Sequence, residues 1–413
     1  MKIRKKYLFY ALAFSSALIG ALISSLDTVI VNKYIFDPWA YGFSCFIVGL
    51  AVTFLLALIF SIPIHGKSLG SRFVDPSFER LRFVRRVEVK YHVFAGIGNS
   101  ILTVGYLHLL SMLGDPSTVL PFSQIVILYL VVIESFVEKN IPTLPEVQSS
   151  IIVTFGAMLG SISLTGTITL DSMFLVFVVI SPAWVLFSIY QRKLKMLRVD
   201  NKSNDSVNIR FWNVVFSFFF SALFIFLYDV LTGSSHFIAG FTASYRYFNW
   251  VALVMIIAFF SYVFYIRALG IGKASVTQAV RASTIFFIIP FSVLLAYLNV
   301  IPMFVTTPVM IVIKIMGVIL VFLGIASFAL TLVKAYIFIR MKPGYPIEET
   351  MQKLWDIPGV THVTAVAGTY DFIVKIRIRT LVKGYENIIR RIEEIKGIRE
   401  YRWNSVLKEW EEI

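Results

Sequence analysis

The sequence predicts a two-part chain, an all-α polytopic membrane domain followed by a smaller α+β domain. Of its 413 residues, 58% are hydrophobic and only 15% are charged, against about 25% charged in a typical soluble domain. The mean hydropathy is +0.79. Long apolar runs continue to about residue 333, and the pattern then changes to short alternating runs and amphipathic stretches. We therefore assign 1–333 to the membrane domain and 334–413 to the second domain.

Ten apolar runs approach or exceed the roughly 18 to 20 residues that cross a bilayer. The first run is long and lacks the small-residue cleavage site of a secretory signal peptide. We therefore expect ten transmembrane helices. The runs lie at 7–32, 39–61, 92–113, 116–137, 148–166, 170–190, 211–231, 248–269, 275–297 and 309–333.

Lysine and arginine residues gather in alternate loops of this arrangement. The opposite loops hold Lys33, Arg246 and almost no other basic residue. By the positive-inside rule, we expect a multi-pass protein of the cell membrane with both termini in the cytosol. The basic residues assigned to the inner side are Lys2, Arg4, Lys5 and Lys6, then Lys67, Arg72, Arg80, Arg82, Arg85, Arg86 and Lys90 in loop 62–91, and Arg192, Lys193, Lys195, Arg198, Lys202 and Arg210 in loop 191–210.

The formal net charge is +14, and residues 1–333 carry +11 of it. Because this excess lies mainly in loops beside the membrane, we interpret it as an orientation signal and a contact with lipid headgroups. We expect no nucleic-acid partner. Cys45 is the single cysteine, so an intramolecular disulfide is excluded.

An internal repeat relates the first five spans to the last five. When the chain is shifted by about 160 positions, Tyr106 falls near Tyr265 and Gly156 falls near Gly317. Copies of five spans enter the membrane from opposite sides, and such inverted repeats place a solute site near the midplane where they meet. We expect a 5+5 inverted repeat with copies at about 7–166 and 170–333.

The end of the first copy has a further pattern. A proline-containing span ends in Glu138, a Pro-Thr-Leu loop follows at 142–144, and the next span carries Gly156 and Gly160. Together with Trp184 in "SPAWVLFSIYQRKL", this pattern resembles the EamA-like family of the drug/metabolite transporter superfamily. The resemblance covers roughly the whole predicted membrane domain and implies transport of small metabolites.

Arg281 is the strongest functional candidate inside a span, because a charge in a bilayer costs several kcal/mol unless it is paired or hydrated. It lies one turn beyond Gln278, so both side chains project from one helical face. Two interpretations stay open. The side chain snorkels to the cytosolic headgroups, or its guanidinium binds an anionic group of a solute as a bidentate fork.

Further polar and aromatic side chains would line a solute cavity if the two copies pack as an inverted repeat. For Trp184, Tyr262 and Tyr265 the alternative is simple packing. For Asp27 the alternative is a position at the membrane interface. Glu134, His108 and Lys314 lie near span ends, where an interfacial or packed position is the simplest interpretation. The cavity candidates are Asp27, Gln124, Trp184, Tyr262 and Tyr265, with Gln278 and Arg281.

The sequence of the second domain predicts the element order β-α-β-β-α-β. "AYIFIRMKPG" and "IREYRWNSVLK" read as the first and last strands, and "VTHVTAVAG" and "DFIVKIRIR" as a hairpin in which Phe372, Val374 and Ile376 share one face. The helix exits "IPGV" and "IKGI" recur 38 residues apart. This is expected of a duplicated βαβ unit in a ferredoxin-like fold.

With "VAGTYDFIVKIRI" at the hairpin, this layout closely resembles the ligand-binding (RAM) domain of the Lrp/AsnC regulators. The resemblance implies sheet-to-sheet dimers that bind amino acids near a Gly-x-Tyr-Asp turn, which here is Gly368, Tyr370 and Asp371. The alternative is a purely structural turn in which Gly368 supplies a positive φ. The regulators' DNA-reading helix-turn-helix has no counterpart here, so we expect no transcriptional control.

These patterns predict an integral membrane transporter of small metabolites, with an amino-acid exporter as the specific hypothesis. A cytosolic amino-acid-sensing domain would regulate it and join it into a homodimer. The alternative is a membrane-anchored amino-acid sensor or receptor without transport activity. Nucleotide sugars and phosphorylated sugars are the other solute classes considered. No cofactor loop, metal-ligand cluster or nucleophile constellation stands out, so we expect no enzyme, catalytic residue, metal or cofactor.

Overall fold

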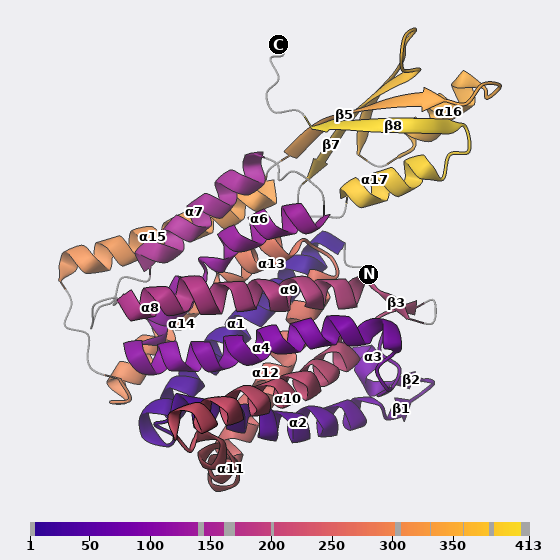
Figure 1. Ribbon diagram of the computed structural model, residues 1–413. Coiled ribbons are helices and arrows are strands. Elements are labelled where there is room, and N and C mark those ends of the chain that lie inside the picture. Colours follow the sequence, from indigo (N-terminus) through magenta and orange to yellow (C-terminus); the bar gives the residue numbers. More distant parts are fainter. Residues whose placement is uncertain are drawn as a thin grey trace.

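The chain forms a large helical part followed by a small antiparallel sheet that carries two helices (Figure 1). The structure is a computed structural model, and the helical part ends at Leu330. It describes residues 5–138, 144–160, 170–199, 202–301, 307–330, 332–357, 359–379 and 384–405.

The long helices follow the apolar runs of the sequence, and two short hairpins and a short helix lie between them. The elements of the helical part are α1 (Lys5–Lys33), α2 (Pro38–Phe60), β1 (Pro63–Ile64), β2 (Lys67–Ser68), α3 (Leu69–Phe73), α4 (Arg86–Leu113), α5 (Pro116–Ser123), α6 (Val126–Glu138), α7 (Leu144–Gly160), α8 (Leu170–Phe174), the π-helix η1 (Leu175–Ile180), α9 (Ser181–Met196), β3 (Arg198–Val199), β4 (Lys202–Ser203), α10 (Ser206–Thr232), α11 (His236–Arg246), α12 (Phe248–Leu269), α13 (Ala274–Arg281), α14 (Thr284–Tyr297) and α15 (Pro308–Leu330).

Eight helical stretches in the described ranges are long and apolar enough to cross a membrane. The other two expected spans are also helical, but in shorter pieces. α5 and α6 are separated at Gln124 and Ile125, and α7 has 17 described residues. The multi-span character of this part is therefore confirmed at the level of helix length and composition, whereas the count of ten stays a prediction.

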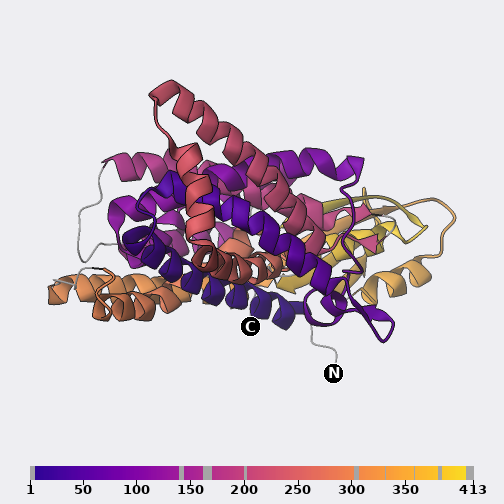
Figure 2. The ribbon, with the colours of Figure 1, turned by 90° about the horizontal axis from the view of Figure 1, so that it is seen from below.

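The helices lie side by side in a bundle (Figures 1 and 2). α7 packs along α15, α4 along α9, α1 along α12, and α2 along α10. Phe9, Tyr41, Phe43, Phe187 and Phe259 are among the largest fully buried side chains of the interior. The start of α1, both short hairpins and the sheet lie toward the same end of the bundle (Figure 1).

Two helices of the bundle are interrupted at corresponding places. The break between α5 and α6 follows Ser123, and the break between α13 and α14 follows Arg281, about 160 positions later. The α8–η1–α9 stretch is irregular as well, because Pro182 at the start of α9 has no amide N–H to donate to the preceding turn. These irregular segments surround the cavity described below.

Four basic residues that the sequence assigned to loop 191–210 belong to helices. α9 continues to Met196 and therefore includes Arg192, Lys193 and Lys195, while α10 begins at Ser206 and includes Arg210. The loop assignment was wrong because buried partners compensate two of these charges. Arg192 Nη1 lies 3.0 Å from Glu134 Oε1, and Lys195 Nζ lies 2.8 Å from Asp75 Oδ2.

The domain after the bundle has the predicted order of elements. Its strands pair in the order β6-β7-β5-β8, and every neighbouring pair is antiparallel. This arrangement is consistent with the ferredoxin-like fold. The elements are β5 (Leu332–Met341), α16 (Ile347–Trp355), β6 (Val360–Ala365), β7 (Phe372–Arg379), α17 (Gly384–Glu393) and β8 (Ile398–Ser405).

One face of this sheet forms the core of the small domain. Phe372, Val374 and Ile376 alternate on β7 as predicted, and all three are fully buried. They pack with Ile337 of β5 and Leu354 of α16. Strand β5 starts at 332, directly after the bundle's last helix ends at 330. The two domains are therefore joined with almost no intervening chain.

Candidate functional site

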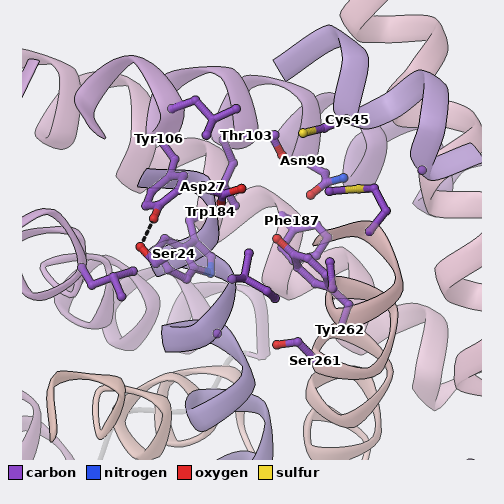
Figure 3. A pocket seen from close by; sticks show the side chains of 18 of the residues that line it. Ser24, Asp27, Cys45, Asn99, Thr103, Tyr106, Trp184, Phe187, Ser261 and Tyr262 are labelled. Atoms are coloured by element: carbon purple, nitrogen blue, oxygen red, sulfur yellow. Dashed lines mark hydrogen bonds between the residues drawn. The ribbon is translucent and has the colours of Figure 1, made fainter. Parts of the chain in front are cut away.

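A cavity of about 140 Å³ lies inside the bundle, between residues contributed by α1, α2, α4, α5, α9, α10, α12, α13 and α14 and by the link between α5 and α6 (Figure 3). Its wall is mostly apolar, with a small number of polar groups that converge on it, as is usual for small-molecule sites. The polar, aromatic and charged residues that line it include Ser24, Asp27, Asn99, Thr103, Tyr106, Gln124, Trp184, Arg210, Ser261, Tyr262, Gln278, Arg281 and Thr284.

The structure brings the sequence candidates together. Six of the seven line this one cavity, and the seventh, Tyr265, lies directly behind it. The Tyr265 side chain is fully buried, and its hydroxyl is hydrogen-bonded to that of Ser188 at 2.7 Å. The six that line the cavity are Asp27, Gln124, Trp184, Tyr262, Gln278 and Arg281.

Arg281 points into the bundle. Its Cζ lies 4.5 Å from the centroid of the Tyr265 ring and 6.0 Å from that of Trp184. A β-carbon placed on Gly20 of α1 would lie 3.6 Å from Arg281 Nη2, so the guanidinium also faces α1. The cation–π contacts hold the half-buried guanidinium at the cavity wall, and the snorkelling and solute-binding interpretations both stay predictions.

Gln124 and Gln278 connect the two interrupted helices. Gln124 Nε2 donates to Leu120 O at 3.1 Å, which satisfies a carbonyl freed by the break after α5. Gln124 Oε1 then accepts from Gln278 Nε2 at 3.0 Å. Gln278 Oε1 is buried without a donor among the described residues. The chain of amides therefore leaves one buried acceptor without a donor beside the cavity.

Asp27 is the carboxylate among the described residues that line the cavity. It is buried, and its Oδ1 accepts from the Tyr41 hydroxyl at 2.6 Å. Asp27 is therefore enclosed by protein, and its depth in the membrane stays a prediction. Nearby, the hydroxyls of Ser24 and Tyr106 are hydrogen-bonded, which joins α1 to α4 (Figure 3).

Arg210 is a cavity residue that the sequence reasoning missed. Its side chain is only 5% exposed, and its Cζ lies 4.1 Å from the centroid of the Tyr262 ring. Arg210 Nε and Nη1 are buried without a hydrogen-bond partner within the described chain. The available signal was its position directly before the apolar run 211–231, where the first turn of a helix continues into the span.

Of the three candidates near span ends, Glu134 holds a helix that forms the cavity wall. It is buried rather than interfacial. It accepts from Ala274 N at 2.7 Å and from Ser275 N at 3.0 Å, so it caps the start of α13. Lys314 Nζ instead donates to Ser117 Oγ at 2.8 Å. The His108 ring packs near Trp39, with 6.3 Å between the two ring centroids.

The Gly-Thr-Tyr-Asp turn of the small domain is tied to the sheet. Asp371 Oδ2 accepts from Met341 N at 2.6 Å, and the Tyr370 ring lies 5.4 Å from that of Phe338. Gly368 is not among the glycines with positive φ, so that expectation was wrong. The loop runs from 366 to 371, and connections of this length are commonly built around turns that need no left-handed residue.

Comparisons with known proteins match the small domain most specifically. Residues 334–412 match the family described as Lrp/AsnC ligand binding domain. No curated protein matches the chain. A solved structure described as "Crystal structure of protein" is 15% identical, with 77% of this chain and 96% of that chain covered and a TM-score of 0.47. The C-terminal part is therefore similar to the ligand-binding domain of that family.

Proposed function

We propose that this protein is an integral membrane transporter of small metabolites, specifically an amino-acid exporter, whose activity is regulated by its cytosolic Lrp/AsnC-like domain. The observation that carries the proposal is the buried cavity between the helices, with charged and amide groups directed into it. A protein that only anchors a sensor has no need for unpaired charged groups in its membrane part, since each of them costs stability.

The EamA-like arrangement of ten spans in a 5+5 inverted repeat is part of the proposal, and three observations support it. Helices occupy each expected run in the described ranges, and the fourth and ninth runs are interrupted at corresponding positions. The helix contacts agree with such a repeat. Exchanging the two copies turns the third span, α4, into the eighth, α12, and turns the sixth span, α9, into the first, α1. The packing of α4 on α9 therefore has its counterpart in the packing of α12 on α1. Interrupted helices at equivalent places mark the solute site in inverted-repeat transporters.

Regulation by the small domain is supported by its attachment. β5 starts at Leu332 and the last bundle helix ends at Leu330. Because the connection is so short, a rotation of the sheet would be transmitted directly to that helix. A ligand of the small domain shifts the transporter only by its difference in affinity for two conformations. A coupling of about 1–3 kcal/mol would change activity several-fold or more. Homodimerisation through this domain would set the orientation of two bundles.

The test is solute flux in proteoliposomes that contain the purified full-length protein and a panel of radiolabelled amino acids and sugars. We expect saturable flux of an amino acid above that of empty liposomes. Saturable binding without flux would instead favour the membrane-anchored sensor. Deletion of residues 334–413 should preserve flux and remove its dependence on cytosolic amino acid.

A further inference from the structure

Two arginines of the cavity rest on neighbouring tyrosines of one helix. Arg210 of α10 lies over Tyr262, and Arg281 of α13 lies over Tyr265, at 4.1 and 4.5 Å from the ring centroids. Tyr262 and Tyr265 are three positions apart on α12, so they occupy one face, with Cβ atoms roughly 5–6 Å apart. Two cationic groups are thereby presented on one side of the cavity by separate helices.

Neither guanidinium is neutralised by a carboxylate within the described chain. Arg210 Nε and Nη1 and Arg281 Nε are buried with no hydrogen-bond partner. Two other buried cations differ in this respect, since Arg192 pairs with Glu134 and the Lys195 ammonium pairs with a carboxylate. A buried charge that lacks a protein partner is costly, and planar guanidinium groups bind carboxylates in a bidentate fork. The arginines therefore have the chemistry of an anion site.

The opposite charge is also present in the cavity. Asp27 is the carboxylate that lines the cavity among the described residues, and its Oδ1 is the oxygen that accepts from Tyr41. The buried carbonyl oxygens of Asn99 and Gln278 have no hydrogen-bond donor within the described chain. These acceptors suit an ammonium group, which has three donors and no acceptor.

We infer that the transported solute is a small dicarboxylic amino acid, that is, a molecule with two carboxylates and one ammonium group. This inference rests on the proposed transport function and narrows its solute. A neutral amino acid would engage one arginine and leave the other without an anion. A dicarboxylate without an ammonium would leave Asp27 without a cation. The volume of about 140 Å³ resembles an engineered cavity of about 150 Å³ that holds benzene, so nucleotide sugars are too large for this conformation.

The experiment is uptake of radiolabelled aspartate into proteoliposomes that contain the full-length protein, with unlabelled aspartate, glutamate, alanine, leucine and succinate as competitors. We expect aspartate or glutamate to compete at least tenfold better than the other three. Arg210→Lys and Arg281→Lys should each lower aspartate flux at least tenfold, since a point charge replaces the fork. Arg246→Lys, an exposed arginine at the end of α11, is the matched control and should leave flux unchanged.

Binding gives a second readout that does not depend on transport. Aspartate should raise the unfolding temperature of the detergent-purified wild-type protein, and of Arg246→Lys, but not that of Arg281→Lys. Asp27→Asn should shift competition from aspartate toward succinate. Flux of neutral amino acids without recognition of aspartate would overturn this inference and leave the transporter proposal intact. Aspartate binding without flux of any solute would overturn the transporter proposal while supporting the site.

Discussion

Gly156 and Gly317 bring the backbones of α7 and α15 into direct contact. A β-carbon on Gly156 would lie 2.8 Å from the Gly317 carbonyl oxygen and 2.7 Å from Val321 N. Close approach of this kind at small residues is a common basis of helix association in membranes, where lipid tails compete with apolar side chains. The fifth and tenth predicted spans, the last of each copy, therefore form a continuous seam.

Gly156→Ala should destabilise the bundle, because the added methyl group meets backbone atoms that cannot rotate away. Overpacking of this type costs about 1–3 kcal/mol. We expect a lower unfolding temperature of the purified protein in detergent. Gly368→Ala is the control, since nothing lies within 4 Å of its added β-carbon. Equal unfolding temperatures for Gly156→Ala and the wild type would contradict the seam.

Glu134→Ala should weaken both folding and solute binding. The change leaves the buried Arg192 guanidinium without its carboxylate, and breaking such a pair costs about 3–5 kcal/mol. It also removes the cap of α13, the helix that carries Arg281 to the cavity. We expect a large drop in unfolding temperature and weaker aspartate binding.

A matched control for this change comes from the small domain. Glu349 and Lys353 form an exposed ion pair one helical turn apart, so Glu349→Ala should change stability by at most about 0.5 kcal/mol. A double-mutant cycle of Glu134→Ala and Arg192→Ala isolates the coupling between these two residues.

Additive effects of Glu134→Ala and Arg192→Ala on stability would argue against an ion pair between them.

Asp75 should contribute stability that depends on pH. Burial alone would raise the pKa of its carboxyl, but the Lys195 ammonium and hydrogen bonds from Lys195, Ser77 and Ser206 outweigh it and hold that pKa well below its usual range. A depressed folded-state pKa contributes stability above the unfolded value of about 4, and the contribution is lost as the pH falls further toward the folded value. At pH 7 the contribution is complete.

Asp75→Asn should therefore lower the unfolding temperature at pH 7, and this deficit should shrink as the pH is lowered below about 4. The measurement is thermal unfolding of wild type and variant in the same detergent across that range. A deficit that is constant from pH 7 to pH 3 would mean that the charge of Asp75 is not what stabilises the loop.

The membrane orientation can be tested with single cysteines in a Cys45→Ser background. Phe83 in the first basic loop and Tyr245 on α11 are strongly exposed, and Trp355 is exposed on the small domain. The positive-inside rule puts Phe83 and Trp355 in the cytosol and Tyr245 outside. An impermeant thiol reagent should label only the Tyr245→Cys variant in intact cells, and labelling of Trp355→Cys would reverse the assigned orientation.

Asp371 should be required for regulation rather than for flux. Asp371→Asn keeps an oxygen acceptor for Met341 N but loses the charge that would pair with the ammonium of a bound amino acid. We expect flux to persist while its dependence on cytosolic amino acid is lost. Glu400→Gln, which alters an exposed pair with Arg340, is the control. An unchanged dependence in Asp371→Asn would leave the turn with a structural role only.

The sequence was sufficient to predict features that follow from apolar length and periodicity. The helical runs, the order of elements in the small domain and the convergence of Asp27, Gln124 and Arg281 on one cavity all depend on these patterns. Membrane helices must satisfy their own backbone hydrogen bonds, so their positions can be predicted from local sequence.

The buried carboxylates that neutralise basic side chains in the folded protein could not be predicted in the same way. Arg192 and Lys195 were counted as loop residues, because composition records a positive charge and not the buried carboxylate that neutralises it. Arg210 was counted with them, although it lies in the cavity wall on a tyrosine that is distant in sequence. The conformation of Gly368 depended on loop length, which the four-residue motif did not specify.

Cys45 gives the chain an internal chemical reporter. It is the single cysteine of the sequence, its thiol is free, and it lines the cavity between the helices (Figure 3). A bulky impermeant thiol reagent applied from one side of the membrane reaches this position only while the cavity is open toward that side. If the protein is the transporter proposed above, the modification rate of the unaltered protein, measured from each side in turn, would report how its time is divided between inward-open and outward-open forms.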